Sequence, residues 1–263
     1  MSTEIWRYIF ASTIGTSHIN SSGVCQDASV CDVHWAPDDS PILIALASDG
    51  AGSALHAEIG SSVICDHFLT EFKTFLNGGG RVPDISHQFV KTGLAKFREA
   101  IATKADSEGL AVRDFACTFL AAVIDTECGM FAQIGDGAIV IADQDEPDAY
   151  CWVFWPHQGE YANQTNFATD SDASEKIEFS FIKESINEVA VFTDGLQNLA
   201  LHFESKQAHT PFFRPIFEWL RHAPDENTDK LSSSLCAFLN SAKVNDHTND
   251  DKSLILATRR QRA

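Results

Sequence analysis

The stretch 41–50, PILIALASDG, is apolar at almost every position before Ser48 and ends in Asp49-Gly50. An apolar run of this kind is typical of a strand in the middle of a sheet, where both faces are buried. Two other apolar segments end in the same dipeptide: FAQIG precedes Asp136-Gly137, and VAVFT precedes Asp194-Gly195. The pattern therefore places three aspartates at the ends of predicted strands.

The remaining chain supplies further strands and two groups of helices. Strand patterns lie at 5–14, 28–35, 41–47, 116–125, 129–134, 138–142, 150–155, 176–182, 189–193 and 254–258. Helical patterns lie at about 52–78, 84–106, 195–203, 211–223 and 229–242. Short turns between the strands after Arg113 are typical of antiparallel hairpins. Two helices between strands, followed by an antiparallel meander, predict an α+β fold. We expect a β-sandwich of two mainly antiparallel sheets flanked by helices on both sides, with residues 1–263 forming a single domain.

Charge and cysteine usage exclude several classes of partner. The 263 residues include 37 acids and 19 bases, which gives a formal net charge of −18. Nucleic acids and anionic membranes bind through clustered Lys and Arg, so neither is expected as a partner.

The seven cysteines show no C-x-x-C pair and indicate buried thiols in a reducing compartment. There is no secretory leader pattern and no apolar run near the roughly 18 residues that span a bilayer. We expect a cytoplasmic monomer.

The aspartates that flank the strands are the candidate functional residues. Each Asp-Gly alone is a favoured turn, and Asp136 lies in a GDG that is expected of a tight hairpin. Asp27 before one strand and Asp250-Asp251 before the last extend the pattern. A sandwich brings strand ends to one edge, where neighbouring carboxylates repel unless protons or cations neutralise them. Carboxylate and carbonyl oxygens suit Mg²⁺ or Mn²⁺, so the residues predict a hard-metal site.

Seven short motifs follow one another along nearly the whole chain. They are Gly15-Thr-Ser-His18, Cys25-Gln-Asp-Ala28, Ser48-Asp-Gly-Ala-Gly52, Cys117-Thr118, Ile134-Gly-Asp-Gly137, Phe192-Thr-Asp-Gly-Leu196 and Asp250-Asp-Lys-Ser-Leu254. In this order, the set resembles the type 2C, or PPM, metal-dependent protein serine/threonine phosphatases. GEYANQTNFATD and DGLQNLAL resemble a short bacterial branch of that family.

The resemblance implies a role for each matching residue. Asp49 would bridge two Mg²⁺ or Mn²⁺ ions, with the Gly50 carbonyl on one of them. Asp194 and Asp250 would bind the other ion, and Asp27 would bind through metal or metal-held water. Asp136 would belong to a third, weaker site. Asp250 is preferred over Asp251 because the family motif places its ligand first.

The resemblance also implies the reaction, which is hydrolysis of phosphoserine and phosphothreonine in phosphorylated proteins. Two ions roughly 3.5–4 Å apart hold a bridging water, lower its pKa and orient it for in-line attack on phosphorus. Asp49, Asp194 and Asp250 would act through that water, without a covalent enzyme intermediate.

This chain departs from the family pattern at three positions. Many members carry a phosphate-binding arginine where Ser22 stands, and His18 and Ser17 are the nearest candidates to contact the phosphate instead. A lone His near a strand end is more often structural. Ala51 replaces the histidine of eukaryotic-type members, and Ser53 replaces a glycine. The general acid therefore has no candidate.

Two rival functions remain open. A pseudophosphatase would keep the fold and metal site but regulate a partner; the missing arginine favours this module and the retained aspartates disfavour it. A metal phosphodiesterase or small-molecule phosphatase is the weaker rival. The polar stretch 156–174 stands where the family has its flap, which makes it a candidate for substrate selection, with a plain surface loop as the alternative.

Overall fold

Two five-stranded sheets form the centre of the protein, in a computed structural model that describes residues 6–143, 146, 149–156, 165–223 and 228–260. Every strand pair is antiparallel. The first sheet has the order β1 (Arg7–Thr13), β12 (Lys252–Thr258), β9 (Glu188–Phe192), β6 (Ala138–Ala142) and β7 (Tyr150–Phe154). The second has the order β2 (Ala28–Trp35), β3 (Pro41–Ser48), β4 (Phe119–Ile124), β5 (Gly129–Ile134) and β8 (Glu178–Ile182). The predicted fold class is confirmed.

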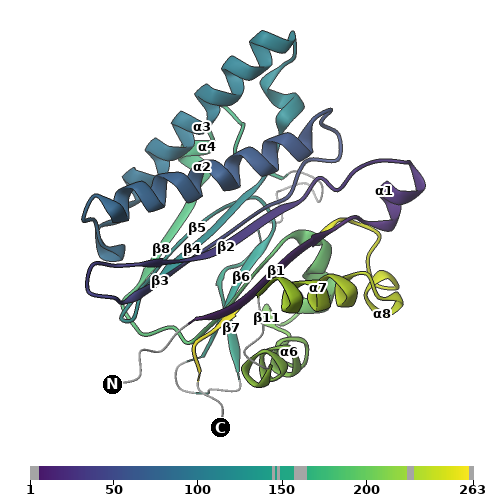
Figure 1. Ribbon diagram of the computed structural model, residues 1–263. Helices are drawn as coiled ribbons and strands as arrows, with labels where there is room; N and C mark the ends of the chain where they lie inside the picture. The colour runs from purple at the N-terminus through teal and green to yellow at the C-terminus, as the bar shows by residue number, and fades with distance from the viewer. Residues whose placement is uncertain (1–5, 144–145, 147–148, 157–164, 224–227, 261–263) are drawn as a thin grey trace.

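Helices cover the outer face of each sheet (Figure 1). On the second sheet lie α2 (Ala57–Asn77) and α3 (His87–Glu108), with the 3-10 turns η1 (Val82–Asp84) and η2 (Val112–Phe115) and the short α4 (Ala173–Lys176). On the first sheet lie α6 (Thr210–His222) and α7 (Thr228–Leu239), with α8 (Ala242–Asn245) next to α7. The short α1 (Thr16–Asn20) follows β1 at the edge where the candidate site lies.

Strand β3 shows why the apolar run 41–47 has no polar gap. Ile42, Ile44 and Leu46 pack in the cluster under α2 and α3. Leu43 and Ala45 point the other way, into the layer between the two sheets. Each fully buried aliphatic side chain of this size stabilises the fold by roughly 1.5–3 kcal/mol. The central position predicted from the sequence is therefore confirmed by burial on both faces.

Helices α2 and α3 pack on the second sheet through the apolar side chains along one face of each helix. Phe68 of α2 is fully buried and stacks on Phe119 of β4 at 4.2 Å between ring centroids. Gly93 of α3 faces that ring, and a Cβ there would lie 2.8 Å from Phe68 Cε1. Helix α3 ends at Glu108 and is followed by Gly109, which has a left-handed φ of 69°. A glycine on the apolar face thus lets α3 approach α2 closely.

The interpretation of the GDG segment 135–137 as a tight hairpin is wrong. Strand β5 pairs with β4 and β8, whereas β6 pairs with β7 and β9 in the other sheet. The segment therefore carries the chain from one sheet to the other. Gly135 has a φ of 111°, and a Cβ at Gly137 would lie 2.7 Å from the Phe192 carbonyl oxygen. Glycine suits both a hairpin and a crossover, so the local sequence could not separate them.

Several predicted boundaries also shift. The pattern at 195–203 is not one helix: the turn η3 (Asp194–Leu196) and α5 (Gln197–Ala200) lead into β10 (Leu201–His202), which pairs with β11 (Gln207–Ala208). Helix α2 begins at Ala57 rather than near Gly52, and β8 begins at Glu178 because α4 precedes it. Of the polar stretch 156–174, residues 157–164 lie outside the described residues.

The cysteines are all free thiols, and four of them are buried: Cys31, Cys65, Cys117 and Cys128. This agrees with the expectation of unpaired, mostly buried thiols. Among the described residues, no helix combines the length and the apolar character that crossing a membrane requires.

A glycine in α2 gives a test of the packing. A Cβ at Gly60 would lie 2.0 Å from the Phe115 carbonyl oxygen of η2, whereas one at Gly52 would meet only Gln26 Oε1, at 4.0 Å. We expect Gly60→Ala to lower the free energy of unfolding by about 3 kcal/mol, because helix and turn must separate. Gly52→Ala serves as the matched control and should stay near wild type. Urea unfolding measures both, and equal stability of the two variants would contradict this packing.

Candidate active site

Three aspartates from both sheets meet at one edge of the sandwich. Asp49 directly follows β3, Asp136 lies in the crossover between β5 and β6, and Asp194 begins η3 after β9. One carboxylate oxygen of each lies within 4.8 Å of the other two. Three of the five aspartates that the sequence analysis expects to converge therefore lie close together in the structure.

Asp49 is held by backbone contacts that continue β3 beyond its last residue. Its N–H donates to Thr118 Oγ1 at 2.9 Å, and the Thr118 N–H donates to the Asp49 carbonyl oxygen at 2.8 Å. Gly50 is buried and forms a β-bridge with Cys117. A Cβ at Gly50 would lie 2.6 Å from the Gln26 carbonyl oxygen, so glycine is required for this approach.

Asp27 is tied to the same cluster through a threonine. Thr193 Oγ1 donates to Asp27 Oδ2 at 2.6 Å and accepts from the Ser253 N–H at 2.9 Å. This connects the residue before β2 with the end of β9 and the start of β12. Burial raises the pKa of Asp27 to about 7, against the lowering effect of the hydrogen bonds from Thr193 and Asp49.

Burial and mutual repulsion raise the pKa of two other carboxyls in the cluster. The pKa of Asp194 rises to about 8, first through burial and then through the charges of Asp136 and Asp250. Burial, followed by the charges of Asp27 and Asp194, holds the pKa of Asp49 well above its usual range. Near neutral pH the cluster must therefore take up protons or cations.

Asp136 supplies an independent sign that the cluster fits a cation. Its Oδ2 accepts a hydrogen bond from Thr165 Oγ1 at 2.6 Å. Its Oδ1 is buried and has no hydrogen-bond partner among the described residues. A buried carboxylate oxygen without a donor is costly unless a cation lies against it. The donor set, all carboxylate oxygen, is the one that Mg²⁺ and Mn²⁺ prefer.

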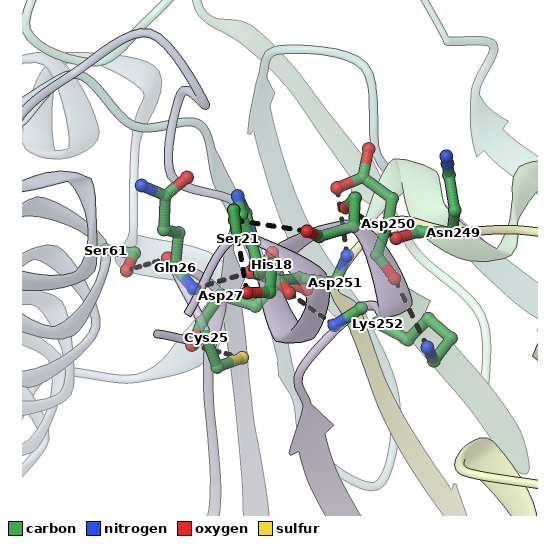
Figure 2. Close-up of polar contacts among 12 residues, drawn as sticks. His18, Ser21, Cys25, Gln26, Asp27, Ser61, Asn249, Asp250, Asp251 and Lys252 are labelled. Carbon is green, nitrogen blue, oxygen red and sulfur yellow. Dashed lines mark hydrogen bonds and ion pairs between the residues drawn. The ribbon is translucent and has the colours of Figure 1, made fainter. Parts of the chain in front are cut away.

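The neighbours Asp250 and Asp251 have opposite environments. Asp251 is 2% exposed, and its carboxylate accepts from the Gly15 N–H and the Gln26 N–H, both at 2.6 Å. Figure 2 shows His18 and Gln26 lying against it. Asp250 is exposed, and its charge contributes to the raised pKa of Asp194. Asp251 is thus an anchor for the chain after β1, while the Asp250 carboxylate is exposed and accepts from the Asp251 N–H at 2.9 Å.

His18, the expected phosphate contact, lies on α1, and one nitrogen of its ring already has a hydrogen-bond partner. Its Nδ1 is 2.9 Å from Asp251 Oδ2, and its side chain is 22% exposed. This hydrogen bond fixes the orientation of the ring. Ser22, at the position where the family resemblance leads one to expect arginine, is exposed and has a left-handed φ of 58°.

Three threonines hold the aspartates, and sequence reasoning assigned none of them a role. Thr118 binds the backbone of Asp49, Thr165 binds Asp136, and Thr193 binds Asp27. Thr118 and Thr193 stand inside motifs that were recognised, so their position carried a signal. Thr165 had none, because only the folded chain brings it to Asp136.

Cys25, two residues before Asp27, does not provide a nucleophile. Burial, then the charges of Asp27 and Asp251, raise the pKa of its thiol to about 12. The thiol stays protonated at neutral pH, as its acidic surroundings indicate.

Comparison with known proteins shows which family the chain belongs to. The family model described as Protein phosphatase 2C matches residues 14–240. The chain belongs to the protein phosphatase 2C family. It is 38% identical over 254 residues to serine/threonine-protein phosphatase 3 of Escherichia coli (strain K12), a match that covers 96% of this chain and 98% of that protein.

Solved structures of bacterial phosphatases share the fold. A bacterial serine phosphatase superposes with a TM-score of 0.61 at 11% identity, covering 98% of this chain and 100% of that one. The serine/threonine phosphatase Stp1 of Staphylococcus aureus gives a TM-score of 0.59 at 13% identity, covering 97% and 95%. These structures show the fold, while the family match and the Escherichia coli relative identify a protein serine/threonine phosphatase and do not support the pseudophosphatase alternative over it.

The raised pKa values predict how the metal-free phosphatase responds to pH. The folded state keeps protons on Asp27 and Asp194 that the unfolded chain releases above its ordinary pKa of 3.8. Their contribution to stability is therefore fully present below that pH and is lost as pH rises through about 7 and 8. Asp194→Asn removes one of these groups.

We expect Asp194→Asn in EDTA to be more stable than wild type by about 2 kcal/mol or more at roughly pH 9, and the difference to shrink toward about pH 5. Urea unfolding across this range measures it. The exposed Asp66→Asn on α2 is the control and should follow wild type. A difference for Asp194→Asn that does not change with pH would contradict the titration.

Substitutions at Asp250 and Asp251 should separate an open ligand from an anchor. Asp250→Asn should weaken Mn²⁺ binding in the phosphatase with little change in metal-free stability, because its carboxylate is exposed. Asp251→Asn should lower the free energy of unfolding by about 2 kcal/mol, because buried donors lose a charged acceptor. Calorimetric Mn²⁺ titration and urea unfolding in EDTA measure the pair. If Asp251→Asn weakened Mn²⁺ binding and Asp250→Asn lowered the free energy of unfolding, the two residues would have exchanged roles.

Proposed function

We propose that this protein phosphatase is Mg²⁺- or Mn²⁺-dependent and hydrolyses phosphoserine and phosphothreonine in proteins. The observation that carries the proposal is the meeting of Asp49, Asp136 and Asp194 within 4.8 Å, with a buried Asp136 oxygen that lacks a hydrogen-bond donor among the described residues. The proposed metal ligands are Asp27, Asp49, Gly50, Asp136, Asp194 and Asp250.

The electrostatic neighbours of the aspartates support a shared site. After burial, the charges of Asp27, Asp194 and Asp136 raise the pKa of Asp49. After burial, the charges of Asp136, Asp250 and Asp27 raise the pKa of Asp194. Both carboxylates therefore have several carboxylate neighbours, which is consistent with ligands shared between ions. We propose two ions, with a third, weaker site at Asp136.

The bound ions would supply an activated water and would offset the charge on the phosphoryl oxygens. The residues of the chain hold the site in shape. Thr193 and Thr118 keep Asp27 and Asp49 in place through hydrogen bonds to side chain and backbone. Asp251 holds the segment with His18, so the ring has a fixed orientation beside the cluster for a contact with the substrate phosphate.

The proposed substrates are phosphorylated proteins, in keeping with the name of the Escherichia coli relative. The formal net charge of −18 is unfavourable for binding nucleic acid or an anionic membrane. We propose that residues 1–263 form one catalytic domain that works as a monomer in the cytoplasm.

Substitution of Asp49 tests the proposal. Because this carboxylate lies between the others, Asp49→Asn should lower Mn²⁺-dependent phosphate release from a phosphothreonine peptide by about a hundredfold or more. Mn²⁺ affinity, measured by calorimetry, should fall in the same variant. The control Asp66→Asn, exposed on α2, should keep wild-type turnover.

Two results would contradict the proposal. One is wild-type protein that binds Mn²⁺ without turning over any phosphopeptide, which is the behaviour of a pseudophosphatase. The other is undiminished turnover by Asp49→Asn in the same assay.

A further inference from the structure

A cavity lies near the aspartate cluster, between α3, η2 and the segment 167–171. Its volume is about 460 Å³, within the range of cavities that hold a ligand side chain or small molecule. Its lining includes two arginines and three hydroxyl side chains, which are Arg98, Arg113, Ser53, Thr169 and Ser171. We call it the arginine pocket.

Short connections join the arginine pocket to the cluster. The Ala51 N–H, two residues after Asp49, donates to the carbonyl oxygen of Ala116, which lines the pocket. On the other side, Thr165 binds Asp136, and Phe167 two residues later lines the pocket. Two residues of extended chain span at most about 7 Å. The pocket is therefore close enough for one substrate peptide to reach both.

The two arginines keep donors available. Arg98 is half-buried and uses Nε to donate to the Thr169 carbonyl oxygen at 3.2 Å, which fixes the guanidinium group against the pocket wall. Arg113 is exposed, and its side chain has no ion pair or hydrogen bond to any residue that the structure describes. Their planar groups match carboxylate and phosphate oxygens.

The acids that line or border the pocket already have partners. Asp114 Oδ2 accepts from the Ala111 N–H at 2.8 Å, and Asp170 Oδ2 accepts from the Phe167 N–H at 3.0 Å. Asp170 and Asp172 lie 3.9 and 3.0 Å from Lys176 Nζ. Arg98 also lowers the pKa of Asp172, after the larger effect of Lys176. Arg113 thus remains the cation that is open to a ligand.

We propose that the arginine pocket binds an anionic group of the substrate, a carboxylate or a second phosphate, about two to four residues from the phosphorylated residue. This inference rests on the proposed function. A chain with a net charge of −18 and an edge lined by aspartates repels acidic peptides. In the pocket lining, Arg98 and Arg113 balance the charges of two aspartates whose carboxylates already accept backbone hydrogen bonds. An anionic group therefore meets two guanidinium groups there, so the pocket selects phosphoproteins with an acidic flank.

Peptide kinetics test the proposal with the full chain in Mn²⁺. A phosphothreonine peptide carries alanine, glutamate, lysine or a non-hydrolysable phosphonate analogue of phosphoserine, one position at a time, at up to about four residues on either side. Phosphate release gives kcat/KM for each. We expect glutamate to exceed alanine about fivefold at one or two positions on one side, and lysine to fall below alanine. The phosphonate arm shows whether a second phosphate is preferred over a carboxylate.

Charge reversal identifies the residue that binds the acidic side chain of the substrate peptide. Arg113→Glu should bring the glutamate-to-alanine ratio to one or below and raise the lysine peptide above the alanine peptide, and Arg113→Ala should bring the ratio close to one. Arg81→Glu is the matched control, because Arg81 is exposed and pairs with Asp84 away from this pocket; it should keep the wild-type ratio.

Equal kcat/KM for the glutamate, phosphonate and alanine peptides at every position would overturn the pocket assignment, as would an unchanged ratio in Arg113→Glu. Either result would leave the proposed phosphatase function standing, since peptides would still be hydrolysed. Failure of the proposed function has a different signature, which is no metal-dependent release from any peptide in the set.

Discussion

Repulsion among buried carboxylates is the constraint on which the rest of the site depends. Two like charges about 4 Å apart near a protein surface repel by roughly 4 kcal/mol, and burial adds to that cost. Asp49, Asp136 and Asp194 nevertheless meet within 4.8 Å. They can do so because each stands where a strand ends and its backbone is fixed by the sheet. The energy stored in this arrangement is what makes cation binding favourable.

The same edge is closed by contacts between segments that are far apart in the chain. Asp251 accepts hydrogen bonds from Gly15 and Gln26, so the start of β12 holds the chain between β1 and β2. A Cβ at Gly195 would lie 1.9 Å from the Asp251 carbonyl oxygen, which brings the end of β9 against the same point. Thr193 then joins this assembly to Asp27. One buried aspartate therefore positions the backbone around its exposed neighbour Asp250.

Much of the fold could be predicted because its signals are local. The bounds predicted for the strands at 28–35, 129–134 and 138–142 are those of β2, β5 and β6. Apolar runs bounded by Gly and Asp define such strands without reference to the rest of the chain. The crossover at 135–137 could not be predicted, because its glycines permit a hairpin as readily as a change of sheet. The pairing of β6 with β9, some fifty residues later in the chain, decides between the hairpin and the crossover.

The sequence by itself determined the strand-end aspartates, the preference of their oxygens for a hard cation and the resemblance to the phosphatase family. Only the tertiary structure decided that Asp251 is buried while Asp250 is open, that Thr165 supports Asp136, and that Arg98 and Arg113 line one pocket. The reason is physical. Residue type and spacing fix local backbone conformation and chemistry, whereas burial, hydrogen-bond partners and electrostatic neighbours arise from segments that meet only when the two sheets pack together.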